Sequence, residues 1–170
     1  MACPHANETV PEGKVARLMT VEDEINEQIQ ITGSKGVAQL CALIEARVAE
    51  FNSVNVAKAF RWVLQGQTNA NETRRVVDHA LRVLEESAVQ NLAGFKAKEV
   101  VNILHAMAKT RYNTENSKLI TLLYDRAEAV AGTFNAQAVA NTLWAYATMG
   151  REPGAVLMRE LAGLMGTSVF

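Results

Sequence analysis

The chain has 170 residues, 49% of them hydrophobic and 21% charged, and 17 lysines and arginines against 18 acidic residues leave a net charge of −1. This length suffices for one compact domain or a short array of repeats, and the near-neutral charge argues against a general polyanion binder. No apolar run approaches the roughly 18 residues of a membrane-spanning helix, and Cys3 and Cys41 are too few for a disulfide framework or a zinc site.

Residues 1–19 predict a flexible leader. Pro4, Pro11 and Gly13 interrupt a mixed polar sequence that shows no apolar period. The segment has neither the apolar core of a secretory signal nor an Arg-rich amphipathic helix, so we expect no cleaved presequence.

Residues 20–33 predict a short acidic helix. Thr20 and Asp23 have the spacing of a capping box, with Asp in the place of the usual Glu. Two isoleucines four residues apart share one face, and Gly33 begins the Gly-Ser-Lys-Gly stretch that we expect to end the helix. Because a repeat array needs a polar outer surface at its end, we expect this helix to cap the segment that follows.

Residues 34–170 carry a repeated pattern that predicts an all-α fold. Phe51, Phe95 and Phe134 stand 44 and 39 residues apart, and apolar residues follow each of them at the same offsets. Each interval also holds a second segment of helical periodicity, and no long stretch alternates with a period of two. A period in this range, with two helices per unit, indicates an α-solenoid of about three and a half helix-pair repeats.

The stretch from Asn135 to Gly150 gives the clearest helix signal. The Asn135 side-chain oxygen can accept from the first unpaired amides, and Gly150 is suited to end the helix. We expect each phenylalanine that precedes such a helix to be buried against the turns that follow it. The buried stripe of this helix is predicted at Val139, Leu143, Tyr146 and Ala147.

The C-terminal end of the pattern is incomplete. Pro153 is suited to the first turn of one more helix, and the next repeat would begin at Phe170. An array that stops there leaves an apolar face uncovered, so we expect either a truncated piece of a longer array or a surface that docks against a partner. The helices predicted before Asn135 span 37–50, 54–65, 71–92, 97–110 and 116–131, and the one after Gly150 spans 153–165.

No arrangement typical of a catalytic or metal site is present in the sequence. His5, His79 and His105 have no Cys or carboxylate at ligand spacing, and there is no Gly-rich phosphate loop or GxSxG motif. Neighbouring acidic residues on the helices are expected to be solvated rather than to act as acid–base pairs. We therefore expect a protein that is not an enzyme and that has no metal and no cofactor.

One side of the second helix of each pair is free of acidic residues and mostly polar. Its side chains stand 3, 7, 10 and 14 residues after each phenylalanine, on one helical line beside the buried stripe. Lys and Arg contact phosphates, amides pair with base edges, and Trp or His can stack on an unpaired base. The line consists of Val54, Lys58, Arg61, Gln65, Lys98, Asn102, His105, Lys109, Gln137, Asn141, Trp144 and Thr148.

A packing role for part of this line is the alternative. Asn141 and Trp144 are also suited to contacts between repeats, with the amide bonded to a loop carbonyl. Trp62 is offset by one position from Trp144, so the two tryptophans do not form a ladder of stacking platforms. The sequence leaves both interpretations open.

The stretch FNAQAVANTLWAYATMG resembles the second helix of an octatricopeptide repeat, whose pattern is roughly FNPQDLANTLWALAKLG. FNSVNVAKAFRWVLQ and FKAKEVVNILHAMAKT are more divergent copies, with Lys96 in place of the capping Asn and His105 in place of the Trp. The same style of helical repeat is shared by FAST kinase-like proteins with RAP domains and by helical-repeat subunits of mitochondrial RNA-editing substrate-binding complexes. The resemblance implies an RNA-binding or RNA-processing factor of a mitochondrion or plastid.

Two functional hypotheses follow. The first is a module that binds single-stranded RNA on its concave face and acts in organelle RNA processing, stability or translation. The second is a protein–protein interaction scaffold, or a helical subunit of a ribonucleoprotein complex, with other subunits bound at the uncovered C-terminal repeat face. Both predict a soluble intracellular protein with no membrane partner.

Overall fold

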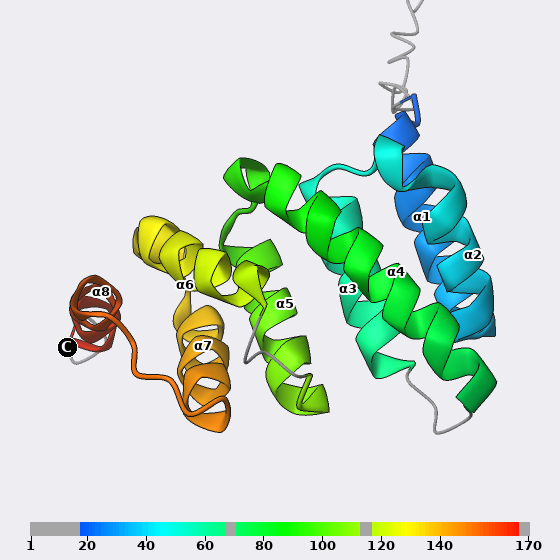
Figure 1. The fold of residues 1–170 in the computed structure, drawn as a ribbon. Coiled ribbons are helices and arrows are strands. Elements are labelled where there is room, and N and C mark those ends of the chain that lie inside the picture. Colours follow the sequence, from blue (N-terminus) through cyan, green and yellow to red (C-terminus); the bar gives the residue numbers. More distant parts are fainter. Residues whose placement is uncertain (1–17, 67–70, 113–116, 167–170) are drawn as a thin grey trace, which may run out of the picture.

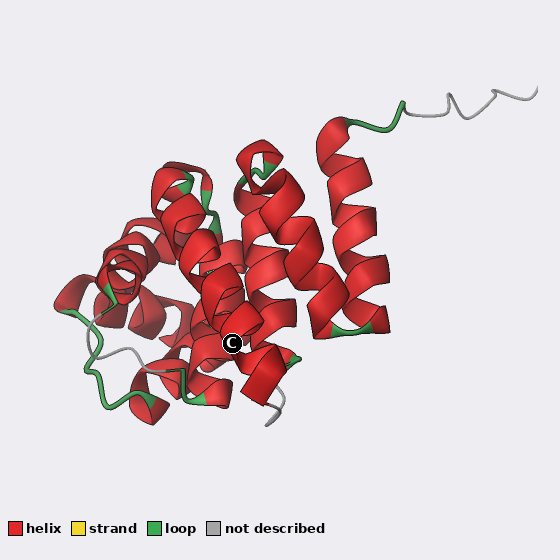
Figure 2. Ribbon diagram, turned by 45° about the vertical axis from the view of Figure 1, so that its right-hand side comes forward, coloured by secondary structure: helices red, strands yellow, loops and turns green. Residues whose placement is uncertain are grey.

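The computed structural model describes residues 18–66, 71–112 and 117–166, and these residues form helices and no strand (Figures 1 and 2). The predicted all-α class is therefore confirmed over the described part of the chain. Its α-helices are α1 (Val21–Lys35), α2 (Val37–Arg47), α3 (Ser53–Gln65), α4 (Asn71–Gln90), α5 (Ala97–Thr110), α6 (Lys118–Val130), α7 (Ala136–Thr148) and α8 (Ala155–Gly166), with the one-turn 3₁₀ helices η1 (Val48–Glu50), η2 (Leu92–Gly94) and η3 (Ala131–Thr133).

The helices lie in two layers (Figure 1). In the odd layer α1, α3, α5 and α7 pack side by side, and in the even layer α2, α4, α6 and α8 follow one another. The odd helices pack closely along their length from α1 to α7, whereas α4 meets α6, and α6 meets α8, at only a few positions. Buried alanines such as Ala57 of α3, Ala106 of α5 and Ala145 of α7 are small enough to let these helix axes approach one another.

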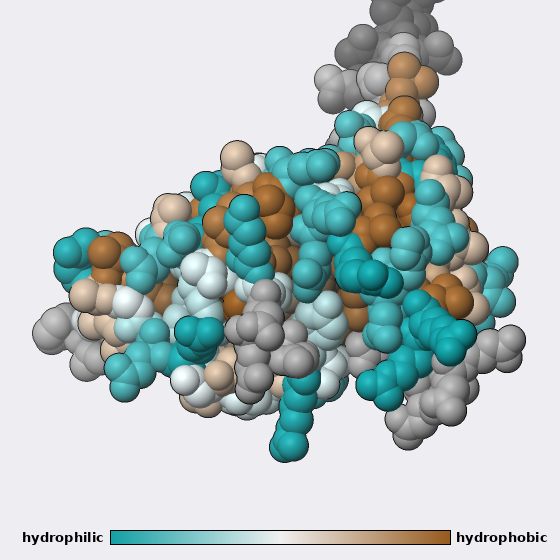
Figure 3. Space-filling view, in the orientation of Figure 1, coloured by the Kyte–Doolittle hydropathy of each residue, from teal (hydrophilic) through white to brown (hydrophobic). Residues whose placement is uncertain are grey.

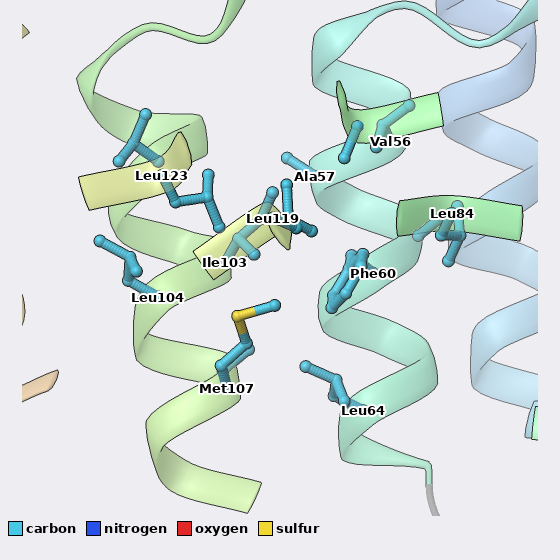
Figure 4. Close-up of a cluster of buried hydrophobic side chains, with 14 of the residues drawn as sticks. Val56, Ala57, Phe60, Leu64, Leu84, Ile103, Leu104, Met107, Leu119 and Leu123 are labelled. Atoms are coloured by element: carbon cyan, nitrogen blue, oxygen red, sulfur yellow. The ribbon is translucent and has the colours of Figure 1, made fainter. Parts of the chain in front are cut away.

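Each even helix and the odd helix that follows it form one unit, so that α2–α3, α4–α5 and α6–α7 are units. The core fills the space between the two layers and between neighbouring units. Figure 4 shows Phe60 and Leu64 of α3 pointing toward Met107 of α5, with Leu119 of α6 close by. All four of these side chains are buried. Apolar contacts of this kind continue from one unit to the next, so the units share one core.

Each passage from the even layer to the odd layer uses the same corner. A 3₁₀ turn ends, and the phenylalanine that follows is extended and donates its N–H to a carbonyl three residues back. These bonds run from Phe51 to Val48 (3.1 Å), from Phe95 to Leu92 (3.1 Å) and from Phe134 to Ala131 (3.0 Å). The three phenylalanines are 5%, 0% and 4% exposed, which confirms their predicted burial.

The odd helices begin with side-chain caps that differ among the units. Asn52 Oδ1 accepts from the Asn55 N–H at 3.0 Å, and Asn55 Oδ1 accepts from the Asn52 N–H at 3.0 Å. The predicted Asn135 cap of α7 is confirmed by a 2.8 Å bond from the N–H three residues on. Lys96 cannot cap α5 in this way, and its own N–H is instead bonded to Glu99 Oε2 at 3.1 Å.

Four details of the prediction are wrong or displaced. α1 begins with the predicted capping box of Thr20, but it does not end at Gly33, because the helix continues to Lys35 and Gly36 turns the chain with φ 143°. Pro153 precedes α8 and is not in its first turn. In α7, Ala147 is exposed and Leu143 is only half-buried, because α7 packs its Val139–Tyr146 side against α5.

Gly33 has a packing role that the sequence did not predict. A Cβ added at Gly33 would lie 2.8 Å from Trp62 Cδ2, so the Trp62 ring rests directly on the α1 backbone. Most of the predicted leader, the turn at 67–69 and Phe170 lie outside the described residues.

Replacement of Phe134 by Ala tests the corner. Because Phe134 is 4% exposed, we expect the free energy of unfolding to fall by about 3–5 kcal/mol, measured by chemical denaturation. Val54→Ala, at a side chain that is 43% exposed, should change it by less than about 0.5 kcal/mol. Equal effects of the two substitutions would contradict the large contribution to stability that we assign to the buried phenylalanine of the corner.

A matched pair of glycine substitutions tests the contact of α1 with Trp62. Helix propensity alone favours Ala over Gly by about 0.8–1.0 kcal/mol. We expect Gly163→Ala in α8, where no described atom outside the adjacent backbone lies within 4 Å of the new Cβ, to follow propensity and raise stability. Gly33→Ala should lower stability because the new Cβ meets the Trp62 ring, and thermal unfolding of both variants decides the sign.

Candidate nucleic-acid interface

The structure places all twelve residues of the predicted line on the outer side of α3, α5 and α7, where none is buried. Because the three helices lie in one layer and start at the same kind of corner, the residues that each helix contributes to the line lie next to those of the neighbouring helix. The exposed members are Val54, Gln65, Lys98, Lys109, Gln137, Trp144 and Thr148, and the half-buried ones are Lys58, Arg61, Asn102, His105 and Asn141.

A hollow of about 330 Å³ between α3 and α5 brings together cations of the line. Lys58, Arg61 and Lys98 line it, together with Asn102 of the line. Lys58 also has a structural role, because its Nζ donates to the Asn26 carbonyl of α1 at 2.8 Å and to Gln30 Oε1 at 3.2 Å. Burial, and then the charges of Arg61 and Lys98, lower the pKa of Lys58.

A second hollow, of about 390 Å³, lies between α5 and α7 and is rich in amide side chains. Asn102, Gln137 and Asn141 line it, and Gln137 Nε2 donates to Asn141 Oδ1 at 2.9 Å. Lys98 and Asn102 line both hollows, so the two adjoin each other across α5.

His105 and Trp144 form an aromatic contact between α5 and α7. Their ring centroids are 4.9 Å apart and the rings are tilted by 40°. Trp144 still exposes 45% of its surface. The two interpretations of Trp144 thus meet in one residue, which packs against the neighbouring unit and also presents an aromatic surface to solvent.

The cations of the line are not neutralised by ion pairs within the described parts of the chain. Arg61, Lys98 and Lys109 have no carboxylate at ion-pair distance there. Arg47, outside the line, shows the contrast, because it pairs with Glu24 at 2.9 Å and with Glu50 at 2.7 Å. The line therefore keeps positive charge available for an anion.

Sequence reasoning missed several residues of the two hollows. Asn26 of α1 and Glu99 of α5 line the α3–α5 hollow, and Thr133 and Asn135 line the α5–α7 hollow. The capping position of Asn135 was a visible signal that it stands beside the line. The sequence predicted that α1 covers the start of the array, but it gave no signal that Asn26 would reach the hollow through the packing of α1 on α3.

Among the described side chains, no three His, Cys, Asp or Glu residues are grouped to hold a metal ion. None of the helices in the described ranges has the length and apolar character needed to cross a membrane.

The pKa of His105 gives a pH-dependent prediction. Burial, and secondarily the Lys109 charge, lower this pKa from its ordinary value of 6.5, so the unfolded chain takes up a proton before the folded chain does. Stability is therefore unaffected by this group above pH 6.5 and falls as the pH drops through 6.5 toward the folded-state pKa. In denaturation at about pH 7.5 and about pH 5.5, His105→Gln should lose less stability than the parent chain. An identical loss in both would contradict the assignment.

Comparison with known proteins identifies a family. The family model of the RNA-editing substrate-binding complex 6 protein (RESC6) matches residues 67–152, just over half of the chain. The matched segment contains α4 to α7, and with them the α5–α7 hollow and the His105–Trp144 contact, but not α3. No curated protein and no solved structure matches the chain. The predicted resemblance to RNA-editing complex subunits is thus confirmed, and the chain belongs to the RNA-editing substrate-binding complex 6 protein family.

Proposed function

We propose that the chain is an RNA-binding subunit of an RNA-editing or RNA-processing complex in an organelle, and that it holds single-stranded RNA on the odd layer. The observation that carries this proposal is the acid-free line along α3, α5 and α7, in which unpaired cations, amides and an exposed Trp144 lie next to one another. Cations bind phosphates, amides pair with base edges, and an aromatic ring stacks on a base.

The relative packing of the two layers supports a concave binding face. From α3 onward the odd helices pack more closely on one another than the even helices do, a difference that would place the odd layer on the inner side of a curved array. We propose on this basis that the helix pairs form an α-solenoid, and such arrays use their concave surface for binding. A strand that follows this surface would meet about one repeat per base.

The family name supports the RNA side of the proposal, because its members are described as proteins of an RNA-editing substrate-binding complex. The resemblance to organelle RNA factors supports the part of this proposal that places the chain in a mitochondrion or a plastid. The related octatricopeptide and FAST kinase-like resemblances remain predictions. We assign binding and not catalysis to the chain, because the line carries no nucleophile with a neighbouring base.

A second candidate function is a docking role in the same complex. Val156 and Met158 of α8 are 42% and 47% exposed, while Leu157 between them is buried. Exposed apolar side chains at one end of the array are suited to contact another protein subunit. This role would accompany RNA binding, and it would replace RNA binding if the test below fails.

Charge reversal of the line tests RNA binding. Fluorescence anisotropy with short single-stranded RNAs would be measured at several salt concentrations for the parent chain and for the triple variant Arg61→Glu, Lys98→Glu, Lys109→Glu. We expect at least about a tenfold loss of affinity and a salt slope lower by about 3, one for each phosphate contact removed. RNA that binds the variant as tightly as the parent would refute the proposal.

Three arginines of the even layer provide the matched control. Arg74, Arg75 and Arg82 of α4 are exposed, and Figure 3 shows hydrophilic side chains gathered over the first half of this helix. Reversal of these three charges changes the net charge of the protein by the same amount as the triple variant of the line. It should leave RNA affinity within about twofold, because salt screens charges that do not contact the RNA. An equal loss in both triples would indicate diffuse attraction, and no RNA binding at low salt would favour the docking role.

A further inference from the structure

The two hollows of the odd layer differ in chemistry although they adjoin. The α3–α5 hollow gathers the charges of Lys58, Arg61 and Lys98 around a single acid, Glu99. That carboxylate is 8% exposed and accepts from the Lys96 N–H, so it is already engaged in the start of α5. The α5–α7 hollow has Lys98 at its edge and otherwise amides, a hydroxyl and small apolar groups.

One cation of the α3–α5 hollow, Lys58, is held in place before any ligand arrives. Lys58 is fixed on α1 by the Asn26 carbonyl and Gln30, close enough to Arg61 and Lys98 for their charges to disfavour its ammonium form. Like charges that are kept together cost free energy, and an anion between them would remove that cost. A phosphate group has the charge and the acceptor oxygens to do so.

The amides of the α5–α7 hollow suit a different part of a nucleotide. Gln137 and Asn141 are oriented by their mutual hydrogen bond, and each amide keeps further donors and acceptors for a base edge. Trp144 stands one helical turn after Asn141 with an exposed aromatic surface. Base edges and faces are what such groups recognise in single strands.

We propose that the α3–α5 hollow is a phosphate subsite and the α5–α7 hollow a base subsite, which together hold one nucleotide of a bound strand with Lys98 and Asn102 between them. This assignment rests on the proposed RNA-binding function. The axes of packed helices lie about 8–10 Å apart, so two neighbouring hollows are separated by about this distance. One nucleotide bridges such a distance from its phosphate to the far edge of its base. The strand backbone then runs over α3–α5, and the base points toward α7.

Single neutral substitutions separate the two subsites. Binding of oligo-A, oligo-C, oligo-G and oligo-U would be followed over a range of salt concentrations. We expect Arg61→Gln to lower the salt slope by about 1 and to weaken all four RNAs alike. Asn141→Ala should leave the slope unchanged and weaken the four RNAs unequally, since a base contact is lost. A lower slope for Asn141→Ala, or a changed order of RNAs for Arg61→Gln, would overturn the assignment.

A small anion probe separates this inference from the proposed function. Inorganic pyrophosphate titrated into the parent chain should shift backbone NMR signals around Arg61 and Lys98, with affinity reduced at least threefold by Arg61→Gln and unchanged by Arg75→Gln. Binding of pyrophosphate near Arg61 and Lys98, without any binding of RNA, would support the phosphate subsite and refute the proposed RNA-binding function. RNA binding with no pyrophosphate shift and no change of slope for Arg61→Gln would leave the RNA function intact and refute the subsites.

Discussion

The burial of one phenylalanine at each corner is the constraint on which the rest of the fold depends. Phe51, Phe95 and Phe134 each follow a one-turn 3₁₀ helix, bond back to it through the main chain and lie in the core between the layers. The ring fixes where the chain crosses from the even layer to the odd layer, and the residue after it occupies the N-cap position of the odd helix. A buried ring of this size makes any other register costly.

Because this corner is repeated, equivalent side chains of successive helices lie on one surface. Because α3, α5 and α7 each begin at the same distance after their phenylalanine, side chains at equal offsets face the same side of the layer. Ties between units keep them aligned, as when Arg126 of α6 donates to the Ala93 and Phe95 carbonyls, both at 2.8 Å, at the corner of the preceding unit. In this member of the RNA-editing substrate-binding complex 6 family, the line of polar side chains therefore results from the repeated corner.

Charge on the molecule is divided by position. On the N-terminal helix α1, Glu24 is paired with Arg47, while Lys58, Arg61 and Lys98 share the α3–α5 hollow, where the one acid is engaged in a cap. A nearly neutral chain can therefore present a local positive field that its net charge conceals. The α1 helix contributes to that field, because its Asn26 carbonyl holds the Lys58 ammonium at the hollow.

The sequence by itself determined the helices, the buried phenylalanines, the Asn135 cap and the twelve outward positions, because each depends on periodicity and on partners only a few residues away. It could not place Gly33 inside α1, since a glycine-rich stretch predicts a break unless a ring such as Trp62 requires close approach. Only the tertiary structure decided that Asn26 and Glu99 share a hollow with the cations, and that His105 contacts Trp144. These pairings depend on how closely whole helices pack, a distance set by the volumes of side chains that lie far apart in the chain.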